Sequence, residues 1–351
     1  MTLGAYINKI ATAVPPHEAH ERFANYLLES PRYREWHDKI RAILPRLDIA
    51  KRYVVMDLFS NGLFENGRAP STAERMRLYQ EHALPLSSLA LEMLFSETSP
   101  RNITHLIVTS CTGFYAPGLD IDIVKRFGLK SSVERTIIGF MGCYAAVPAY
   151  KIASHIVRAD PKSRVLVVNL ELCSLHWRPD VPLDQFLTYL LFADGCAASL
   201  VSADSTGLRL LDFNSMLLSD TADRMCWTIG DEGFFMRLSA DVPELLGAAL
   251  RKNPPQFSAG TTLSDIHFWA IHPGGRSIVD AVGAALRLHE SDLHPSRHVL
   301  KNYGNMSSAT LPFILKTLID DKATPKGLGL AMAFGPGLAL ETFLFFKEAS
   351  S

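Results

Sequence analysis

The pattern of apolar and polar positions divides the chain into two regions. Residues 17–95 are polar and helix-prone, which predicts a mainly helical segment. From residue 103 onward, short apolar runs alternate with helix-like segments such as Leu119–Phe127 and Pro148–Arg158. The runs predicted as strands are 103–109, 135–140, 163–169, 197–201, 265–272, 328–334 and 339–345. Strands that alternate with helices favour an α/β layered fold.

Three pairs of short segments indicate that the chain contains two related halves. The pairs are 105–113 with 267–275, 142–148 with 306–312, and 192–197 with 334–339. They occur in the same order, as expected for a duplication, although chance similarity is the alternative because each is short. Turn residues at 204–207 separate a first half, 1–204, from a second, 205–351. In this register Cys143 is aligned with Ser307, so only one half carries a nucleophilic thiol.

Composition narrows the class of protein. The chain has 351 residues, of which 48% are hydrophobic and 20% are charged, so a large core is expected and disorder is not. A net charge of −1 argues against a nucleic-acid partner. The five cysteines are odd in number and form no CxxC pair, which predicts no metal site and free thiols in a reducing compartment.

The N-terminal segment has no charged region followed by an apolar one, so no signal peptide is expected. The longest uncharged runs fall short of the roughly 20 apolar residues that a membrane helix needs. The sequence therefore predicts a cytoplasmic protein with no membrane span.

Cys143 is the candidate nucleophile because it lies between an apolar, strand-like run and a helix-like segment of small residues. A thiol at a strand-to-helix turn lies near the positive end of a helix dipole, which favours the thiolate. The stretch Thr136–Tyr150 carries no charged side chain, so we expect a buried thiol reached by a channel. Such a site suits an acyl-accepting nucleophile, whereas a buried cysteine that acts as a small hydrophobe is the alternative.

His272 and Asn305 also stand where apolar runs end. His272 closes a predicted strand and precedes a Gly-rich turn, and Asn305 lies in a loop that is expected to open a helix. An imidazole and an amide NH₂ can both donate hydrogen bonds to a thioester oxygen, as decarboxylation of a malonyl thioester requires. Taken singly, a turn histidine and a helix-capping asparagine are the alternatives.

These segments resemble a known family over nearly the whole chain. The motifs Gly142-Cys143-Tyr144-Ala145, His272-Pro273-Gly274-Gly275-Arg276, Gly304-Asn305-Met306-Ser307-Ser308 and Gly335-Pro336-Gly337 resemble those of chalcone-synthase-like type III polyketide synthases. The resemblance implies the thiolase fold, with two similar αβαβα halves in a five-layered core, and a homodimer. It implies that Cys143 carries the acyl group while His272 and Asn305 activate malonyl-CoA. No metal or organic cofactor is implied, since coenzyme A enters with the acyl-CoA and malonyl-CoA substrates.

The resemblance also implies which residues line the substrate pocket. Phe192 matches the family's aromatic gate, with a plain core aromatic as the alternative. The other implied positions are Cys111, Thr112, Cys173, His176, Trp227, Met236, Ser307 and Pro336. Several depart from plant chalcone synthases: Trp227 stands at a glycine position and Met236 at a second gating phenylalanine. Ala116 stands at a methionine position, which puts the dimer contact of that methionine in doubt.

The phosphates of coenzyme A require cations. The resemblance places them on a basic helix before Lys51-Arg52-Tyr53, where this chain has Lys39, Arg41 and Arg46. A solvated helix face is the alternative.

Flexible Met236 and soft Cys173 suit an alkyl chain better than a planar ring. We therefore expect a fatty acyl-CoA starter of medium to long chain, extended by malonyl units and closed to an alkylpyrone or alkylresorcinol. A chalcone- or naphthol-type synthase with another starter is one alternative. A ketoacyl-acyl carrier protein synthase III is another, although its usual His-Gln-Ala-Asn element is absent. A degenerate scaffold subunit is a third, which an intact Cys143, His272 and Asn305 argue against.

Overall fold

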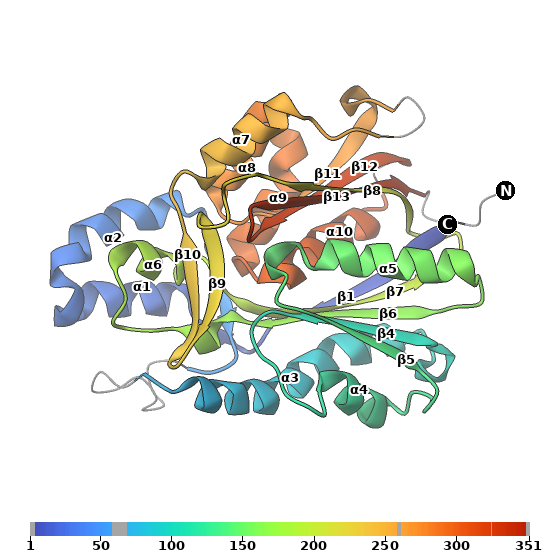
Figure 1. Cartoon of the computed structure of the whole chain (residues 1–351), viewed down its shortest axis with the longest axis horizontal. Coiled ribbons are helices and arrows are strands. Elements are labelled where there is room, and N and C mark those ends of the chain that lie inside the picture. Colours follow the sequence, from blue (N-terminus) through green and yellow to red (C-terminus); the bar gives the residue numbers. More distant parts are fainter. Residues whose placement is uncertain (1–3, 58–68, 258–260, 324, 349–351) are drawn as a thin grey trace.

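The computed structural model describes residues 4–57, 69–257, 261–323 and 325–348 (Figure 1). Within these ranges nine strands form one sheet in the order β11-β12-β13-β8-β1-β7-β6-β4-β5. The strands are β1 (Ala5–Ala13), β4 (His105–Ser110), β5 (Glu134–Gly139), β6 (Val165–Leu172), β7 (Asp194–Ser202), β8 (Leu208–Leu217), β11 (Ile266–Ile271), β12 (Gly327–Gly335) and β13 (Ala339–Lys347). β1 and β8 join two parts of this sheet through a short antiparallel contact of Ala5–Ile7 with residues 208–210.

The two parts of the sheet share one topology. In the first, β4 and β6 are parallel, and β6–β7 and β7–β1 are antiparallel. In the second, β11 and β12 are parallel, and β12–β13 and β13–β8 are antiparallel. β5 lies parallel to β4 at the edge and is additional to this shared pattern. Every strand predicted from the sequence coincides with an observed one, whereas β1 and β8 were not predicted.

Helices cover the sheet in layers. The buried helices α5 (Ala146–Ala159) and α10 (Thr310–Asp320) share one core with inward-facing residues of both parts of the sheet, such as Val167 and Phe343. On the outer faces, α3 (Thr72–Phe95) and α4 (Leu119–Phe127) cover the first part. The second part is covered by α7 (Val242–Lys252), α8 (Arg276–Leu286) and α9 (Glu290–Tyr303). These layers form the αβαβα arrangement expected from the sequence.

A helical corner packs beside the central layers. The helices α1 (His20–Glu29), α2 (His37–Ile43) and α6 (Leu183–Thr188) form a corner with its own core around Trp177 and Phe186. The helix-prone segment 17–95 thus contains α1, α2 and α3 and the two-residue strands β2 (His17–Glu18) and β3 (Tyr53–Val54). Its residues 58–68 lie outside the described ranges, as do residues 1–3 of the N-terminal segment.

The hairpin of β9 (Met225–Gly230) and β10 (Gly233–Leu238) crosses from the second half to the start of α3 (Figure 1). The N–H of Thr72 donates to the carbonyl of Asp231 at 2.7 Å, and the N–H of Gly233 donates to Oγ1 of Thr72 at 2.9 Å. These contacts fix the hairpin, which carries Trp227 and Met236 on facing strands.

Candidate functional site

Cys143 lies in a 3₁₀ turn, Gly142–Tyr144, between β5 and α5. Gly142 has φ +78°, and a Cβ there would lie 2.4 Å from Cδ of Pro336. The turn after β12 therefore packs directly on the nucleophile turn, and only glycine fits at the contact. The thiol is buried, as the uncharged stretch around it predicted.

His272 and Asn305 are held by the backbone of the second half. The N–H of His272 donates to the carbonyl of Met332 at 2.8 Å, so the imidazole follows β11 directly. Asn305 exchanges backbone hydrogen bonds of 2.9 Å with Leu191 and Ala193. Its side-chain Oδ1 accepts the N–H of Ser307 at 2.9 Å, and its Nδ2 donates to the carbonyl of Gly274 at 3.2 Å. The amide NH₂ is thereby oriented away from the loop that carries it.

Cys143, His272 and Asn305 line one small cavity, which we call the central cavity. Its other lining residues are Phe192, Met225, Met236, Leu238, Gly274, Ile278 and Phe334. The volume is about 30 Å³, which is enough for roughly two waters. Three polar residues far apart in sequence therefore meet at a single, largely apolar space.

Burial sets the protonation of the thiol and the imidazole. Burial raises the pKa of Cys143 to about 12, against hydrogen bonds from Ser307 and Asn305 that lower it. Burial also lowers the pKa of His272 to about 3, and both ring nitrogens lack a partner among the described residues. The site without substrate therefore favours a neutral thiol and a neutral imidazole. The thiolate expected from the helix dipole is not favoured here, because desolvation opposes the charge.

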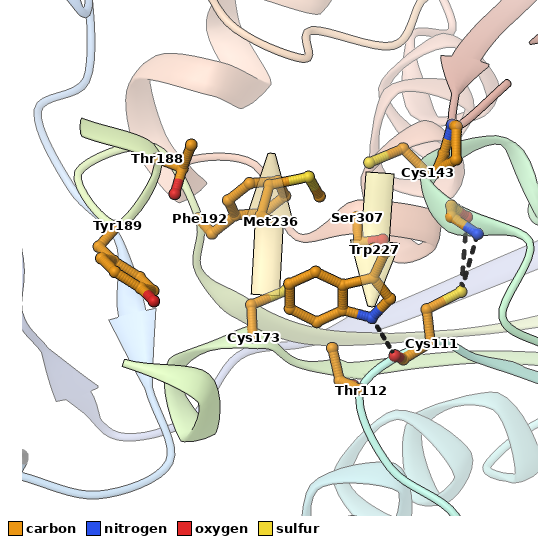
Figure 2. Close-up of a pocket in the computed structure, with 12 residues that line it drawn as sticks. Cys111, Thr112, Cys143, Cys173, Thr188, Tyr189, Phe192, Trp227, Met236 and Ser307 are labelled. Carbon is orange, nitrogen blue, oxygen red and sulfur yellow. Dashed lines mark hydrogen bonds between the residues drawn. The ribbon is translucent and has the colours of Figure 1, made fainter. Parts of the chain in front are cut away.

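A second space, which we call the deep pocket, also adjoins Cys143 (Figure 2). It is lined by Cys111, Thr112, Gly142, Cys143, Cys173, Thr188, Tyr189, Phe192, Trp227, Met236, Ser307 and Pro336. All of the predicted pocket residues except His176 are among them. Gly142, Thr188 and Tyr189 were not predicted. Phe192 and Met236 also line the central cavity, so they lie between the two spaces.

His176 does not line the deep pocket, and that prediction is wrong. Its Nε2 lies 2.7 Å from the carbonyl of Thr112, and its Nδ1 accepts the N–H of Phe234 at 3.0 Å. The imidazole stacks on the Phe234 ring at 4.2 Å, and burial lowers its pKa to about 3. Both nitrogens pair with buried backbone groups, which draws the ring behind Trp227.

Glu171 is a buried residue to which the sequence assigned no role. Its carboxyl accepts hydrogen bonds from the N–H of Cys111 at 3.0 Å, Oγ1 of Thr112 at 2.9 Å and Oγ of Ser308 at 2.5 Å. Burial raises its pKa to about 7. The carboxyl thus joins the ends of β4 and β6 to the loop after Asn305, beneath the deep pocket. A lone acid in the otherwise uncharged strand 165–172 was the available signal.

A third space, the outer pocket, adjoins the central cavity. The two share Leu238, Gly274 and Ile278, and the outer pocket has a volume of about 420 Å³. Its remaining lining residues are Thr188, Leu191, Arg237, Ser239, Ala240, Val242, Pro243, Gly275 and Ser277. Among these described residues Arg237 alone carries a charge, and its side chain is exposed. Sequence reasoning missed Arg237, although it directly follows the predicted pocket residue Met236.

The predicted coenzyme A cations lie elsewhere. Lys39 and Arg41 are on α2, Arg46 is on the short turn Leu44–Arg46, and all three are exposed. None lines the outer pocket, and Arg41 pairs with Asp38 at 3.2 Å. Their role in binding stays a prediction.

Comparison of the sequence with known protein families identifies the family to which the chain belongs. The profile described as chalcone and stilbene synthases, N-terminal domain, matches residues 4–205, and the C-terminal domain profile matches residues 212–347. The chain belongs to the chalcone and stilbene synthase family. The resemblance noted from its motifs is therefore confirmed.

Individual relatives agree with this assignment. The chain is 33% identical to an alpha-pyrone synthesis polyketide synthase-like protein, Pks18, of Mycobacterium tuberculosis, over 98% of this chain and 91% of that one. It is 28% identical to polyketide synthase 37 of Dictyostelium discoideum, over 95% of this chain but 12% of that protein.

Solved structures agree in fold. PKS-I of the brown alga Ectocarpus siliculosus matches with a TM-score of 0.88 and 28% identity over 99% of both chains. The C-terminal type III polyketide synthase domain of Steely1 from Dictyostelium matches with a TM-score of 0.87 and 25% identity, over 99% of this chain and 100% of that one. The expected thiolase fold is confirmed. Family members are condensing acyltransferases that use acyl-CoA and malonyl-CoA, and this protein is an enzyme of that type.

In the part of the chain that the structure describes, no helix has the length and apolar character needed to cross a membrane. Nor do the described histidine, cysteine and acidic side chains form a group of three that could hold a metal ion.

Proposed function

We propose that this type III polyketide synthase loads a fatty acyl group from coenzyme A onto Cys143 and extends it by decarboxylative condensation with malonyl-CoA. Release as an alkylpyrone is favoured over an alkylresorcinol, because a relative that covers nearly the whole chain is named for alpha-pyrone synthesis. The observation that carries the proposal is that Cys143, His272 and Asn305 line one cavity between two pockets.

Loading begins with a thioester that enters through the outer pocket. The sulfur of Cys143 attacks the thioester carbonyl, and its proton passes by way of His272 to the departing sulfur of coenzyme A. The products are an acyl-Cys143 thioester and free coenzyme A. A neutral imidazole can serve in this step because its unprotonated nitrogen accepts the thiol proton and then passes it to the departing sulfur.

Extension uses His272 and Asn305 as hydrogen-bond donors to a second thioester, that of malonyl-CoA. His272 and the NH₂ of Asn305 donate hydrogen bonds to the malonyl carbonyl oxygen, which gains negative charge as CO₂ leaves. One donor of this type is worth about 3 kcal/mol in the transition state. The enolate carbon then attacks acyl-Cys143, a C–C bond forms, and the Cys143 sulfur departs. Phe192 and Met236 present apolar surface beside these groups, which keeps water from the enolate.

The binding of coenzyme A is assigned to the outer pocket, with Arg237 beside its phosphates. Lys39, Arg41 and Arg46 remain the candidates for phosphates that extend past the pocket, since α2 packs through the same core as α6. No metal or organic cofactor enters this scheme, and we propose a cytoplasmic location for the enzyme.

A homodimer is also part of the proposal. β5 is an edge strand on which Ile137 is 52% exposed, and Phe114 beside it is 39% exposed. A Cβ at Gly139 of β5 would lie 2.7 Å from the Phe114 ring, so the two apolar side chains belong to one surface. Covering this edge with a second copy removes apolar area from water and completes strand pairing. Light scattering should give twice the chain mass, and a monomer at micromolar concentration would contradict the dimer.

The decisive experiment is a product mass spectrum. The purified enzyme is incubated with labelled malonyl-CoA and acyl-CoA starters from acetyl to palmitoyl, with coumaroyl-CoA as the aromatic comparison. We expect alkylpyrone masses from fatty starters. Preference for the aromatic starter would contradict the fatty acyl assignment, and a single-extension diketide held on a carrier protein would favour a ketoacyl synthase.

A further inference from the structure

The indole of Trp227 lies across the deep pocket and is fixed at several points. Its Nε1 donates to the carbonyl of Cys111 at 2.7 Å. Its ring packs edge-on against His176 at 5.3 Å and Phe234 at 5.8 Å. Figure 2 shows the indole at the centre of the lining residues, with Met236 and Phe192 on one side and Cys111 and Cys143 on the other.

The acceptor of this hydrogen bond cannot move easily. Besides its carbonyl, Cys111 is held through its N–H, which donates to Glu171 at 3.0 Å. It is also held through its sulfur, which accepts the N–H of Gly142 at 2.9 Å. Gly142 immediately precedes the nucleophile, so a shift of Cys111 would disturb the turn that carries Cys143. If the pocket is to enlarge, the indole must leave and Cys111 must stay.

The deep pocket is small while the indole is in place. Its volume is about 30 Å³, room for roughly two waters. A long acyl chain on Cys143 cannot enter that space. For the deep pocket to hold a longer chain, the Trp227 side chain must rotate and give up its bond to Cys111.

We propose that Trp227 is a hydrogen-bonded gate that sets the length of the acyl starter. With the gate closed the pocket takes a short chain, and a longer chain is admitted only when the indole N–H leaves the Cys111 carbonyl. That carbonyl then has no partner in apolar surroundings, so long starters are disfavoured by about tenfold. This inference rests on the proposed loading of acyl groups on Cys143 and names the device that selects among them.

Two substitutions separate the hydrogen bond from the bulk of the side chain. Trp227→Phe keeps an aromatic ring but has no N–H, and Trp227→Gly removes both. The measurement is the rate of Cys143 acylation by hexanoyl-CoA and by myristoyl-CoA, followed by intact-protein mass without malonyl-CoA. Trp36→Phe makes the same chemical change in the helical corner, where Trp36 stacks on Tyr33 and lines none of the three spaces.

We expect the wild type and Trp36→Phe to prefer hexanoyl-CoA. Trp227→Phe should raise the myristoyl-to-hexanoyl rate ratio about tenfold, and Trp227→Gly should raise it further. An unchanged ratio in Trp227→Phe beside a raised ratio in Trp227→Gly would overturn the gate, since bulk alone would explain selection. Unchanged ratios in both, or no acylation of any variant, would overturn it as well. Formation of polyketide is measured separately, so failure of condensation with a shifted acylation ratio would count against the proposed function alone.

Discussion

The deep pocket and the outer pocket both adjoin the central cavity that Cys143, His272 and Asn305 line, yet they are built differently. The deep pocket has about 30 Å³ of space, and an indole hydrogen-bonded to a fixed carbonyl fills its centre. The outer pocket has about 420 Å³ and a lining that includes Thr188, Ser239, Ser277 and Arg237. The difference supports our proposal that acyl chains are selected in the deep pocket, where packing is tight. The invariant part of a coenzyme A thioester needs only an open, polar entrance.

The largest expected effect comes from removing Cys143, which lines both the deep pocket and the central cavity. Cys143→Ala should lower polyketide formation by at least about 1000-fold, because no other group accepts the acyl chain. Product mass measures this, with Cys226→Ala as the control, since Cys226 lines none of the three spaces. Retained condensation in Cys143→Ala would contradict the role of Cys143 as the acyl acceptor beside the deep pocket.

The second effect separates chemistry in the central cavity from loading. Asn305→Ala should slow malonyl-CoA decarboxylation by about 100-fold through loss of one donor to the enolate oxygen. Acylation of Cys143 by hexanoyl-CoA should fall much less. Release of labelled CO₂ and intact-protein mass report the two steps, and an unchanged rate of CO₂ release would remove the role given to Asn305.

The third effect concerns the protonation of the Cys143 thiol. Burial raises the pKa of Cys143 to about 12, so the neutral thiol predominates at lower pH and thiolate increases as pH rises. Iodoacetamide alkylation of Cys143 in the free enzyme should therefore accelerate about tenfold per pH unit from pH 7 to pH 9. Peptide mapping follows each cysteine. A rate that is already level at pH 7 would indicate the thiolate expected from the helix dipole and contradict the neutral pair.

The smallest effect tests the outer pocket alone. Arg237→Gln should raise the KM for malonyl-CoA about two- to fivefold, because an exposed cation contributes modestly to phosphate binding. The KM for malonyl-N-acetylcysteamine, which has no phosphates, should not change. Arg251→Gln is the matched control, since Arg251 is an exposed cation in the last turn of α7 and lines none of the three spaces. Equal KM increases for both thioesters would show that Arg237 shapes the entrance without recognising charge.

Several features of the site could be predicted from the sequence because they depend on local pattern. Cys143, His272 and Asn305 each end an apolar run, and their motifs match one family over nearly the whole chain. The alternation of strands and helices predicted an α/β layered fold, and the family resemblance implied the αβαβα order of the layers. Of the pocket positions carried over by resemblance, all except His176 line the deep pocket, and their role in substrate binding stays a prediction.

Other features depend on contacts between distant segments. His176 turned away from the pocket because backbone groups of Thr112 and Phe234 hold both of its nitrogens. The strands β1 and β8 were missed because polar residues interrupt their apolar positions, so that pairing with neighbouring strands decides their conformation. The protonation of Cys143 followed the loss of water around it, which local sequence does not specify.

The sequence by itself determined the α/β class, the three catalytic candidates and the motifs that match the family, since each depends on residues close together along the chain. The order of the layers was implied by the family resemblance. Only the tertiary structure decided how deep the acyl pocket is, where Arg237 stands and what holds Trp227. Those properties follow from volumes and hydrogen bonds between residues more than a hundred positions apart, as Trp227 and Cys111 are.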